Sequence, residues 1–279
     1  MLRFIRLALF PVGLIAALPA SAQDEGETPA DDIVVTGVPL REGEETPVTL
    51  QDDGLSGAVS RQIASEVDRF ARCADLPRPD LLRRIVDGKP ESGEAQRALH
   101  EHILRNSGCY GTIFPPIPDT PYYGKCNPVM VNDIRGNNIC RADYDRGEIY
   151  EQVLRKYAPD LVINRSITFN PEIRADFMAR EERRNQDRVL SNDLFWFASC
   201  AVQIRPEYAL AMMKEEAGSG REARLQELMI KDGLPCFAGG KVEEVTVDSR
   251  QFRAFVAEAL YSWAVAVKNV DSLIPQDLG

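Results

Sequence analysis

The chain has 279 residues, of which 44% are hydrophobic and 27% are charged, and its formal net charge at pH 7 is −10. The excess acid is concentrated in residues 23–58, where ten carboxylates are opposed by Arg41 alone. The rest of the chain is nearly balanced in charge, so the sequence predicts no basic surface for nucleic acid.

The first 22 residues have the organisation of a secretory signal peptide. Arg3 and Arg6 form a basic region, residues 7–18 form an apolar run, and Ala20-Ser21-Ala22 is a small-residue cleavage site. The apolar run is too short to cross a bilayer, and no run elsewhere approaches 18 apolar residues. We therefore expect a bacterial protein that is periplasmic or secreted and has no membrane span.

Residues 23–58 are rich in acid, Gly, Pro and Thr, and they predict a disordered linker. Within this linker, the segment Asp31–Gly37 (DDIVVTG) resembles the start of TonB-dependent outer-membrane receptors, whereas the rest of the chain does not. The resemblance implies a peptide that adds a strand to a sheet edge of another protein. An inherited leader segment without a role is the alternative interpretation.

The remainder of the chain contains an internal repeat. Residues 70–110 align without a gap on residues 197–237, with 11 identities in 41 pairs, where average residue usage gives about 2 or 3 by chance. The shared features include Phe-Ala-x-Cys-Ala, Arg-Pro followed by an acid, and Ser-Gly. The sequence therefore predicts two copies of one structural unit, over residues 59–158 and 159–279.

Six cysteines in an exported chain predict three disulfides. Each copy of the repeat contains two cysteines at the same separation, which favours pairing within the copy and leaves no thiol for nucleophilic chemistry. The predicted disulfides are Cys73–Cys109, Cys126–Cys140 and Cys200–Cys236.

Helical periodicity begins at Val59 and predicts four helices in each copy. In the first copy, apolar residues at spacings of three and four lead to Cys73, Pro79 opens a second helix, and Ser92 opens a third. In the second copy, residues 248–267 have the strongest apolar face. Between the copies, residues 161–169 predict a strand or an extended linker, and a long charged helix runs from Pro171 into Cys200. The tail after Asn269 is predicted to fray.

Residues 111–142 are an insertion that the second copy lacks, and their prolines exclude a helix. We expect an ordered, exposed loop, closed by Cys126–Cys140, that contacts a partner. The alternative is that its apolar residues cap the core of the first unit. The candidate contact residues are Phe114, Ile117, Tyr122, Tyr123 and Met130.

No constellation of residues in the sequence indicates catalysis, a cofactor or a metal site. His100 and His102 are the two histidines, and positions i and i+2 of a helix point in different directions. The favoured interpretation is a non-catalytic interaction module whose partner is another envelope protein. The alternative is an envelope hydrolase that uses carboxylates in a groove between the two units.

The repeated motifs, together with Glu-Ala-Leu-Tyr at residues 258–261, resemble a group of uncharacterised exported helical proteins of alphaproteobacteria. The resemblance implies a helical fold and an envelope location, and it implies no activity and no functional residues. Together these observations predict an all-α protein: a duplicated, disulfide-stapled four-helix unit with a Pro-rich loop inserted in the first copy.

Overall fold

The computed structural model describes residues 61–109, 141–189, 191–236 and 247–276 in full, and the backbone of several short flanking segments. These backbone segments are residues 48–50, 54–60, 130–132, 138–140 and 245–246.

Over these residues the protein is all-α, as predicted. Two sets of four helices follow one another along the chain, and two further helices, α5 and α6, lie between them. The first set is α1 (Gly54–Cys73), α2 (Pro79–Val86), α3 (Gly93–Arg105) and α4 (Arg141–Tyr157). The second set is α7 (Asn192–Ile204), α8 (Pro206–Met212), α9 (Gly220–Asp232) and α10 (Ser249–Lys268). The connecting helices are α5 (Arg165–Thr168) and α6 (Pro171–Asn185).

Equivalent residues start the helices of both sets. Pro79 and Pro206 occupy the first position of α2 and α8, where a missing N–H costs no hydrogen bond. Ser92 and Ser219 cap α3 and α9, because each Oγ accepts a hydrogen bond from the backbone N–H three residues later. The duplication read from the sequence is therefore repeated in the local chemistry of the fold.

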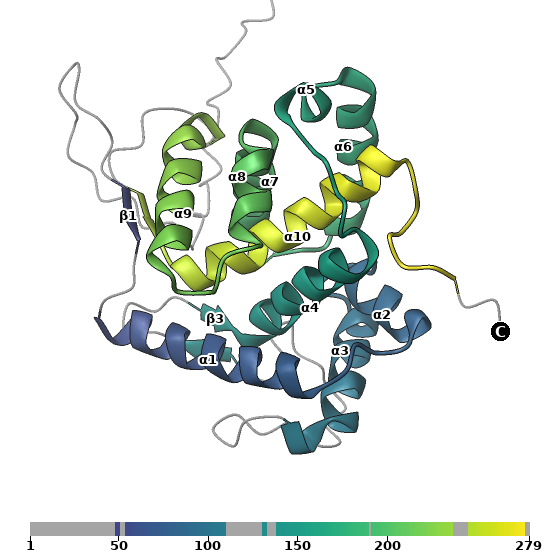
Figure 1. Cartoon of the computed structure of the whole chain (residues 1–279). Helices are drawn as coiled ribbons and strands as arrows, with labels where there is room; N and C mark the ends of the chain where they lie inside the picture. The colour runs from purple at the N-terminus through teal and green to yellow at the C-terminus, as the bar shows by residue number, and fades with distance from the viewer. Residues whose placement is uncertain are drawn as a thin grey trace, which may run out of the picture.

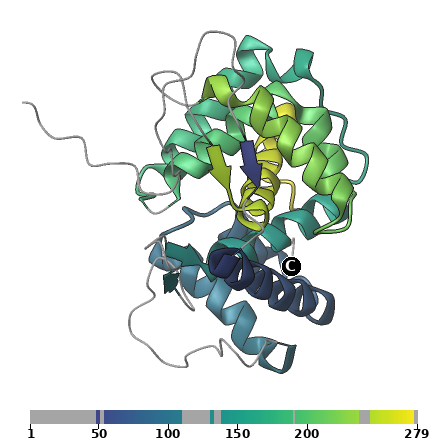
Figure 2. The same cartoon turned by 90° about the vertical axis from the view of Figure 1, so that its left-hand side faces the viewer.

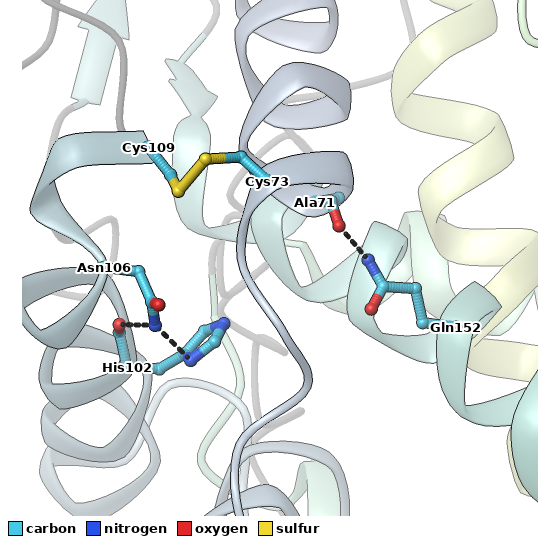
Figure 3. Close-up of a disulfide and its surroundings, with 6 residues drawn as sticks. All are labelled: Ala71, Cys73, His102, Asn106, Cys109 and Gln152. Carbon is cyan, nitrogen blue, oxygen red and sulfur yellow. Dashed lines mark hydrogen bonds between the residues drawn. A yellow bond between two sulfur atoms is a disulfide. The ribbon is translucent and has the colours of Figure 1, made fainter.

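The two disulfides within the copies are confirmed. Cys73–Cys109 and Cys200–Cys236 join the first helix of each set to a 3-10 turn that follows the third helix. Figure 3 shows the first of them beside His102 and Asn106 of the α3 region. The predicted pair Cys126–Cys140 lies outside the described residues at Cys126.

The fourth helices of the two sets, α4 and α10, pack against each other at the centre of the molecule (Figure 1). α1 to α3 lie on one side of this pair and α7 to α9 on the other. One hydrophobic cluster runs through both sets, and α10 is buried along almost its whole length. On α10, Trp263 stacks on Phe177 of α6 with ring centroids 4.0 Å apart. Because the two copies share one core, neither set buries its apolar faces alone.

Two pairs of short strands accompany the helices. β1 (Val48–Leu50) runs parallel to β4 (Val245–Val247), and the two are visible side by side in Figure 2. β2 (Met130–Asn132) is antiparallel to β3 (Asn138–Cys140).

β1 and the first residues of α1 fall within residues 23–58, so the prediction of disorder is wrong at the end of that segment. Val48–Leu50 pairs with a strand nearly two hundred residues later, and α1 begins at Gly54, five residues before Val59. Local composition cannot reveal a backbone partner so distant in the sequence. The rest of the predicted linker and the signal peptide lie outside the described residues.

Three other expectations are corrected. Residues 161–169 contain the helix α5, because the Asn164 side chain caps it by accepting from the Ile167 N–H. The long helix from Pro171 to Cys200 is interrupted after Asn185, and α7 begins at Asn192. The C-terminal tail is not frayed at 271–276, since Ile274 is buried and its carbonyl accepts from Arg83 of α2 at 3.0 Å.

The insertion at 111–142 is described only in part. Phe114, Ile117, Tyr122 and Tyr123 lie outside the described residues, and for Met130 only its backbone in β2 is described. Its predicted end is two residues late, because α4 begins at Arg141 and the side chains of Arg141 and Ala142 are buried. The contact role of this loop stays a prediction.

Candidate functional site

A small cavity opens where the two copies meet. Its volume is about 60 Å³, which is room for a few water molecules or for one small polar group. Its walls come from α1, α4 and α10 and from the connection between α8 and α9. The lining residues are Ala64, Val67, Asp68, Tyr144, Gly147, Glu148, Glu151, Ala217, Arg250, Arg253 and Ala254. We call this cavity the junction pocket.

The floor of the junction pocket is the crossing of α4 and α10. A Cβ atom on Gly147 would overlap the Cβ and Cα of Ala254, so a glycine is required for the two helices to approach this closely. The two residues lie at the point where one helix crosses the other. They therefore define matching positions in the fourth helices of the two copies.

Aligned on this crossing, α4 and α10 share the pattern Arg-[Gly/Ala]-x-[Ile/Val]-x-Glu at an offset of 107 residues. The matching pairs are Arg146 with Arg253, Gly147 with Ala254, Ile149 with Val256 and Glu151 with Glu258.

Contacts across the crossing follow the same approximate two-fold relation. Arg253 donates from Nε and Nη2 to the two carboxylate oxygens of Glu151, at 2.7 and 2.8 Å. The equivalent arginine of α4, Arg146, lies close enough to Glu258 of α10 for its charge to help lower the pKa of Glu258. The junction pocket on the Glu151 side must therefore have a counterpart on the Glu258 side.

That counterpart is filled by Arg188. Its Nη1 and Nη2 each donate to one oxygen of Glu258 at 3.1 Å, and its Nε donates to Ser191 Oγ at 2.9 Å. The guanidinium carbon lies 5.0 Å from the ring centroid of Phe195 and 5.1 Å from that of Phe255. Arg188 is thus held between two aromatic faces, above a carboxylate. We call this arrangement the Arg188 seat.

Each residue that holds Arg188 has a counterpart in the wall of the junction pocket. Residues of α1 correspond to residues 127 positions later, in or just before α7, as in the sequence repeat. Residues of α4 correspond to residues of α10 that lie 107 positions later. Phe195 corresponds to Asp68, Phe255 to Glu148, Glu258 to Glu151 and Ser191 to Ala64. The junction pocket therefore corresponds to the Arg188 seat by position, but its carboxylate, Glu151, is bonded to Arg253 of the pocket wall.

A difference in one helix explains why one site is filled and the other is open. Arg61 is the repeat counterpart of Arg188, but it belongs to the continuous helix α1 and its side chain is exposed. In the second copy the helix is broken at residues 186–191, which lets Arg188 leave the helical path and turn inward. The interruption that the sequence did not predict is what fills the second site.

The electrostatics of the two sites also differ. On the filled side, Arg146 is neutralised by Asp143 on its own helix, at 2.5 Å. The counterpart of Asp143 on α10 is Arg250, a like charge, so Arg253 takes its acidic partners elsewhere. Those partners are Glu151 at 2.7 Å and Glu222 at 3.1 Å.

Glu258 on the filled side is a strongly stabilised carboxylate. Burial by itself raises the pKa of Glu258, but the charges of Arg188 and Arg184 outweigh this effect and hold the pKa at about 2. Arg184 contributes a further hydrogen bond to Glu258 at 2.6 Å. This cluster of charges is buried and fully paired, as a structural site requires.

Glu148 on the open side shows the opposite behaviour. Burial and then the neighbouring Glu151 carboxylate raise the pKa of Glu148 to about 7. Two cationic neighbours, Arg155 at 2.9 Å and Arg253, lower the pKa, but they do not outweigh the effect of burial and of Glu151. At neutral pH the junction pocket therefore contains a carboxyl group that is incompletely compensated by positive charge.

The histidines lie away from the junction pocket, on α3. His102 packs edge-on against Phe70, with ring centroids 5.4 Å apart, and burial lowers the pKa of His102 to about 4. Asn106 Nδ2 lies 3.3 Å from His102 Nδ1, as Figure 3 shows. His100 is also buried. Both residues occupy helix positions in the interior of the first unit, and within the described ranges no cluster of three or more His, Cys, Asp or Glu side chains is arranged to hold a metal ion.

Comparison of the chain with protein families, with curated proteins and with solved structures gave no match. Among the helices that the structure describes, none is long and apolar enough to cross a membrane.

The sequence indicated a groove between the copies only in the hydrolase alternative, and it identified no residue of the junction pocket. A signal was present, because the Arg-[Gly/Ala]-x-[Ile/Val]-x-Glu pattern occurs in both fourth helices. The sequence alignment of the two copies, at an offset of 127 residues, ends just after the second cysteine of each copy. The insertion at 111–142 then changes the offset to 107 residues for the fourth helices, so an alignment at a single offset could not reveal their match. The role of Arg188 gave no signal of this kind, since it depends on the interruption between α6 and α7.

Proposed function

We propose that this protein is a non-catalytic binding module of the bacterial envelope, and that it binds another envelope protein at the junction pocket. The observation that carries the proposal is the pairing of one filled and one open version of the same site. The chain satisfies the second site with its own Arg188, whereas the first site retains its acidic wall and an opening to solvent.

The surroundings of the junction pocket support binding by a rigid surface. Its walls are helices of a shared core, and the first unit is held by the Cys73–Cys109 disulfide. A site on elements of this kind loses little conformational entropy when a partner binds. The predicted signal peptide and the disulfides support an exported location. The insertion at 111–142 remains a second candidate contact surface.

Position-specific cross-linking in the native envelope tests this proposal. A photoactivatable amino acid replaces Ala64 or Ala217 in the pocket wall, and Glu182, exposed on α6, serves as the control position. We expect one protein, identified by mass spectrometry, to be captured from both pocket positions and not from the control. Equal capture from all three positions, or a cross-link to residues 23–47 of the same chain, would overturn the proposal.

An envelope hydrolase is the second candidate, and the raised pKa of Glu148 is the observation that favours it. A carboxyl group with a pKa of about 7 is suited to general acid catalysis near neutral pH. Glu151 lies on the same helix face but is held by both Arg253 and Arg155, which fits a fixed charge better than a base that transfers protons. Hydrolysis of an envelope substrate that is lost in both Glu148→Gln and Glu151→Gln would favour this candidate over the binding module.

A further inference from the structure

The chemistry of the ligand can be read from the filled version of the site. The Arg188 seat binds a guanidinium group by its two faces, through Phe195 and Phe255, and by its edge, through Glu258. The carboxylate that receives the edge has an equivalent in the junction pocket, Glu151. A planar cation of four heavy atoms fits a cavity of about 60 Å³.

Substitutions between the two copies replace the aromatic faces of the seat with acidic side chains. Asp68 stands at the position of Phe195, and Glu148 at the position of Phe255. The attraction of a ring face for a cation is thereby replaced by direct attraction between opposite charges. The pocket therefore keeps its preference for a cation while it becomes more polar than its filled counterpart.

The arginines in the pocket wall are committed to internal partners. Arg253 bonds to Glu151 and Glu222, and Arg250 lies 3.6 Å from Glu222. By contrast, the arginines that pair with Asp68 and Glu148 lie at the surface. The side chain of Arg72, the partner of Asp68, is 71% exposed, and that of Arg155, the partner of Glu148, is 52% exposed. Surface pairs of this kind contribute little and exchange readily, so an incoming cation can take their place.

We propose that the junction pocket receives an arginine side chain of the partner protein between Asp68 and Glu148, at the position that corresponds to Arg188 in the second copy, while Glu151 stays bonded to Arg253. This inference rests on the proposed binding function and specifies what is recognised. A guanidinium in place of Arg155 would become the charge partner of Glu148, a carboxyl group whose pKa is raised by burial and by Glu151.

A matched pair of small molecules tests the inference on the full mature chain with its disulfides formed. Nα-acetyl-arginine amide is the probe, and Nα-acetyl-citrulline amide is its neutral isostere. Backbone amide signals are followed by NMR during titration. We expect saturable shifts at Gly147, Ala217 and their neighbours with the arginine derivative, and binding weaker by about tenfold or more with citrulline.

Variants of single carboxylates supply the controls. Glu148→Gln is expected to weaken binding of the arginine derivative by about tenfold. Asp68→Asn, at a partly exposed position, is expected to weaken it by a smaller factor. Glu182→Gln removes the same charge from an exposed site on α6 and is expected to leave the affinity unchanged.

The inference is overturned if arginine and citrulline derivatives bind equally, if the shifts do not saturate, or if Glu182→Gln weakens binding as much as Glu148→Gln. The cross-linking experiment separates this failure from failure of the proposed function. Specific capture from Ala64 together with no preference for arginine leaves the binding module intact and removes only the cation specificity. Absence of both results removes both proposals.

Discussion

The Arg188 seat and the junction pocket are two versions of one site within a single chain. Both lie beside the crossing of α4 and α10, and both are built from a first helix, a fourth helix and a Glu four residues after the crossing point. In the second copy a break between α6 and α7 brings Arg188 inward, and in the first copy α1 continues without a break. The difference shows that one repeated geometry is closed by an internal arginine in the second copy and has a small cavity at the same place in the first.

The largest expected effect comes from the matching glutamates. Glu258→Gln should destabilise the protein by about 3–5 kcal/mol, because Arg188 would be left buried without a carboxylate and Arg184 would keep only Glu181. Glu151→Gln should cost less, about 1–3 kcal/mol, since Arg253 keeps Glu222 and Arg155 reaches solvent. Urea unfolding of the two variants measures the difference. Equal losses of unfolding free energy would show that the two glutamates are paired equally strongly, which contradicts the description of one filled and one open site.

The disulfides should affect both copies to the same extent. Each bond closes a segment of 36 residues, for which chain entropy gives a stabilisation of up to about 4 kcal/mol. The paired variants Cys73→Ala/Cys109→Ala and Cys200→Ala/Cys236→Ala are therefore expected to lose similar free energy in urea unfolding. A loss confined to one pair would indicate that the copies are unequal in stability as well as in the occupancy of the site.

The crossing of α4 and α10 should be sensitive to one methyl group. Gly147→Ala is expected to cost about 1–3 kcal/mol, because the added Cβ overlaps Ala254 and the helices must separate. Adding Ala254→Gly should recover part of that loss, since it removes the methyl group of α10 that the new methyl group of α4 would overlap. Gly220→Ala is the control, because a Cβ there meets no atom within 4 Å, and it should not destabilise the protein. Thermal unfolding of the wild type, the single variant, the double variant and the control measures these differences.

The smallest expected effect is a difference in pH dependence between the two sites. The pKa of Glu148 is raised from 4.5 to about 7, so the unfolded chain releases this proton first and stability falls as the pH rises from 4.5 to 7. The pKa of Glu258 is lowered from 4.5 to about 2, so its contribution is present above pH 4.5 and is lost as the pH falls towards 2. Glu148 faces Glu151 and Arg155 on its own helix and Arg253 on α10.

Urea unfolding of wild type and Glu148→Gln across this pH range isolates the first effect, because other groups, His102 among them, cancel in the difference. The wild type is expected to lose stability relative to the variant as the pH rises to 7. A difference that does not change with pH would show that Glu148 is compensated in the folded protein, and it would weaken the argument for a cationic ligand.

Local patterns predicted much of the fold. Pro79 predicted the start of a second helix, and α2 begins there with its apolar residues Leu81, Leu82, Ile85 and Val86 buried. The repeat predicted the pairing of Cys73 with Cys109 and of Cys200 with Cys236. These features depend on spacing along the chain, which the sequence displays directly.

Features that depend on distant contacts were not predictable in this way. Val48–Leu50 looked disordered because its partner strand lies at 245–247. The docked C-terminal residues looked frayed because the hydrogen bond from Arg83 to Ile274 joins opposite ends of the folded chain. Glu148 and Glu151 resembled any other acids on a helix, since neither their burial nor their arginine neighbours can be read from α4 alone.

The sequence by itself determined the helical repeat, its two disulfides and the equivalence of the two copies, because periodicity and cysteine spacing are local properties. The tertiary structure alone decided which copy would be open. That outcome depends on how closely Gly147 lets α4 approach α10, and on whether the chain entering the first helix of each copy is continuous or broken. The first depends on packing between helices about one hundred residues apart, and the second places Arg188 against Glu258, 70 residues further along the chain.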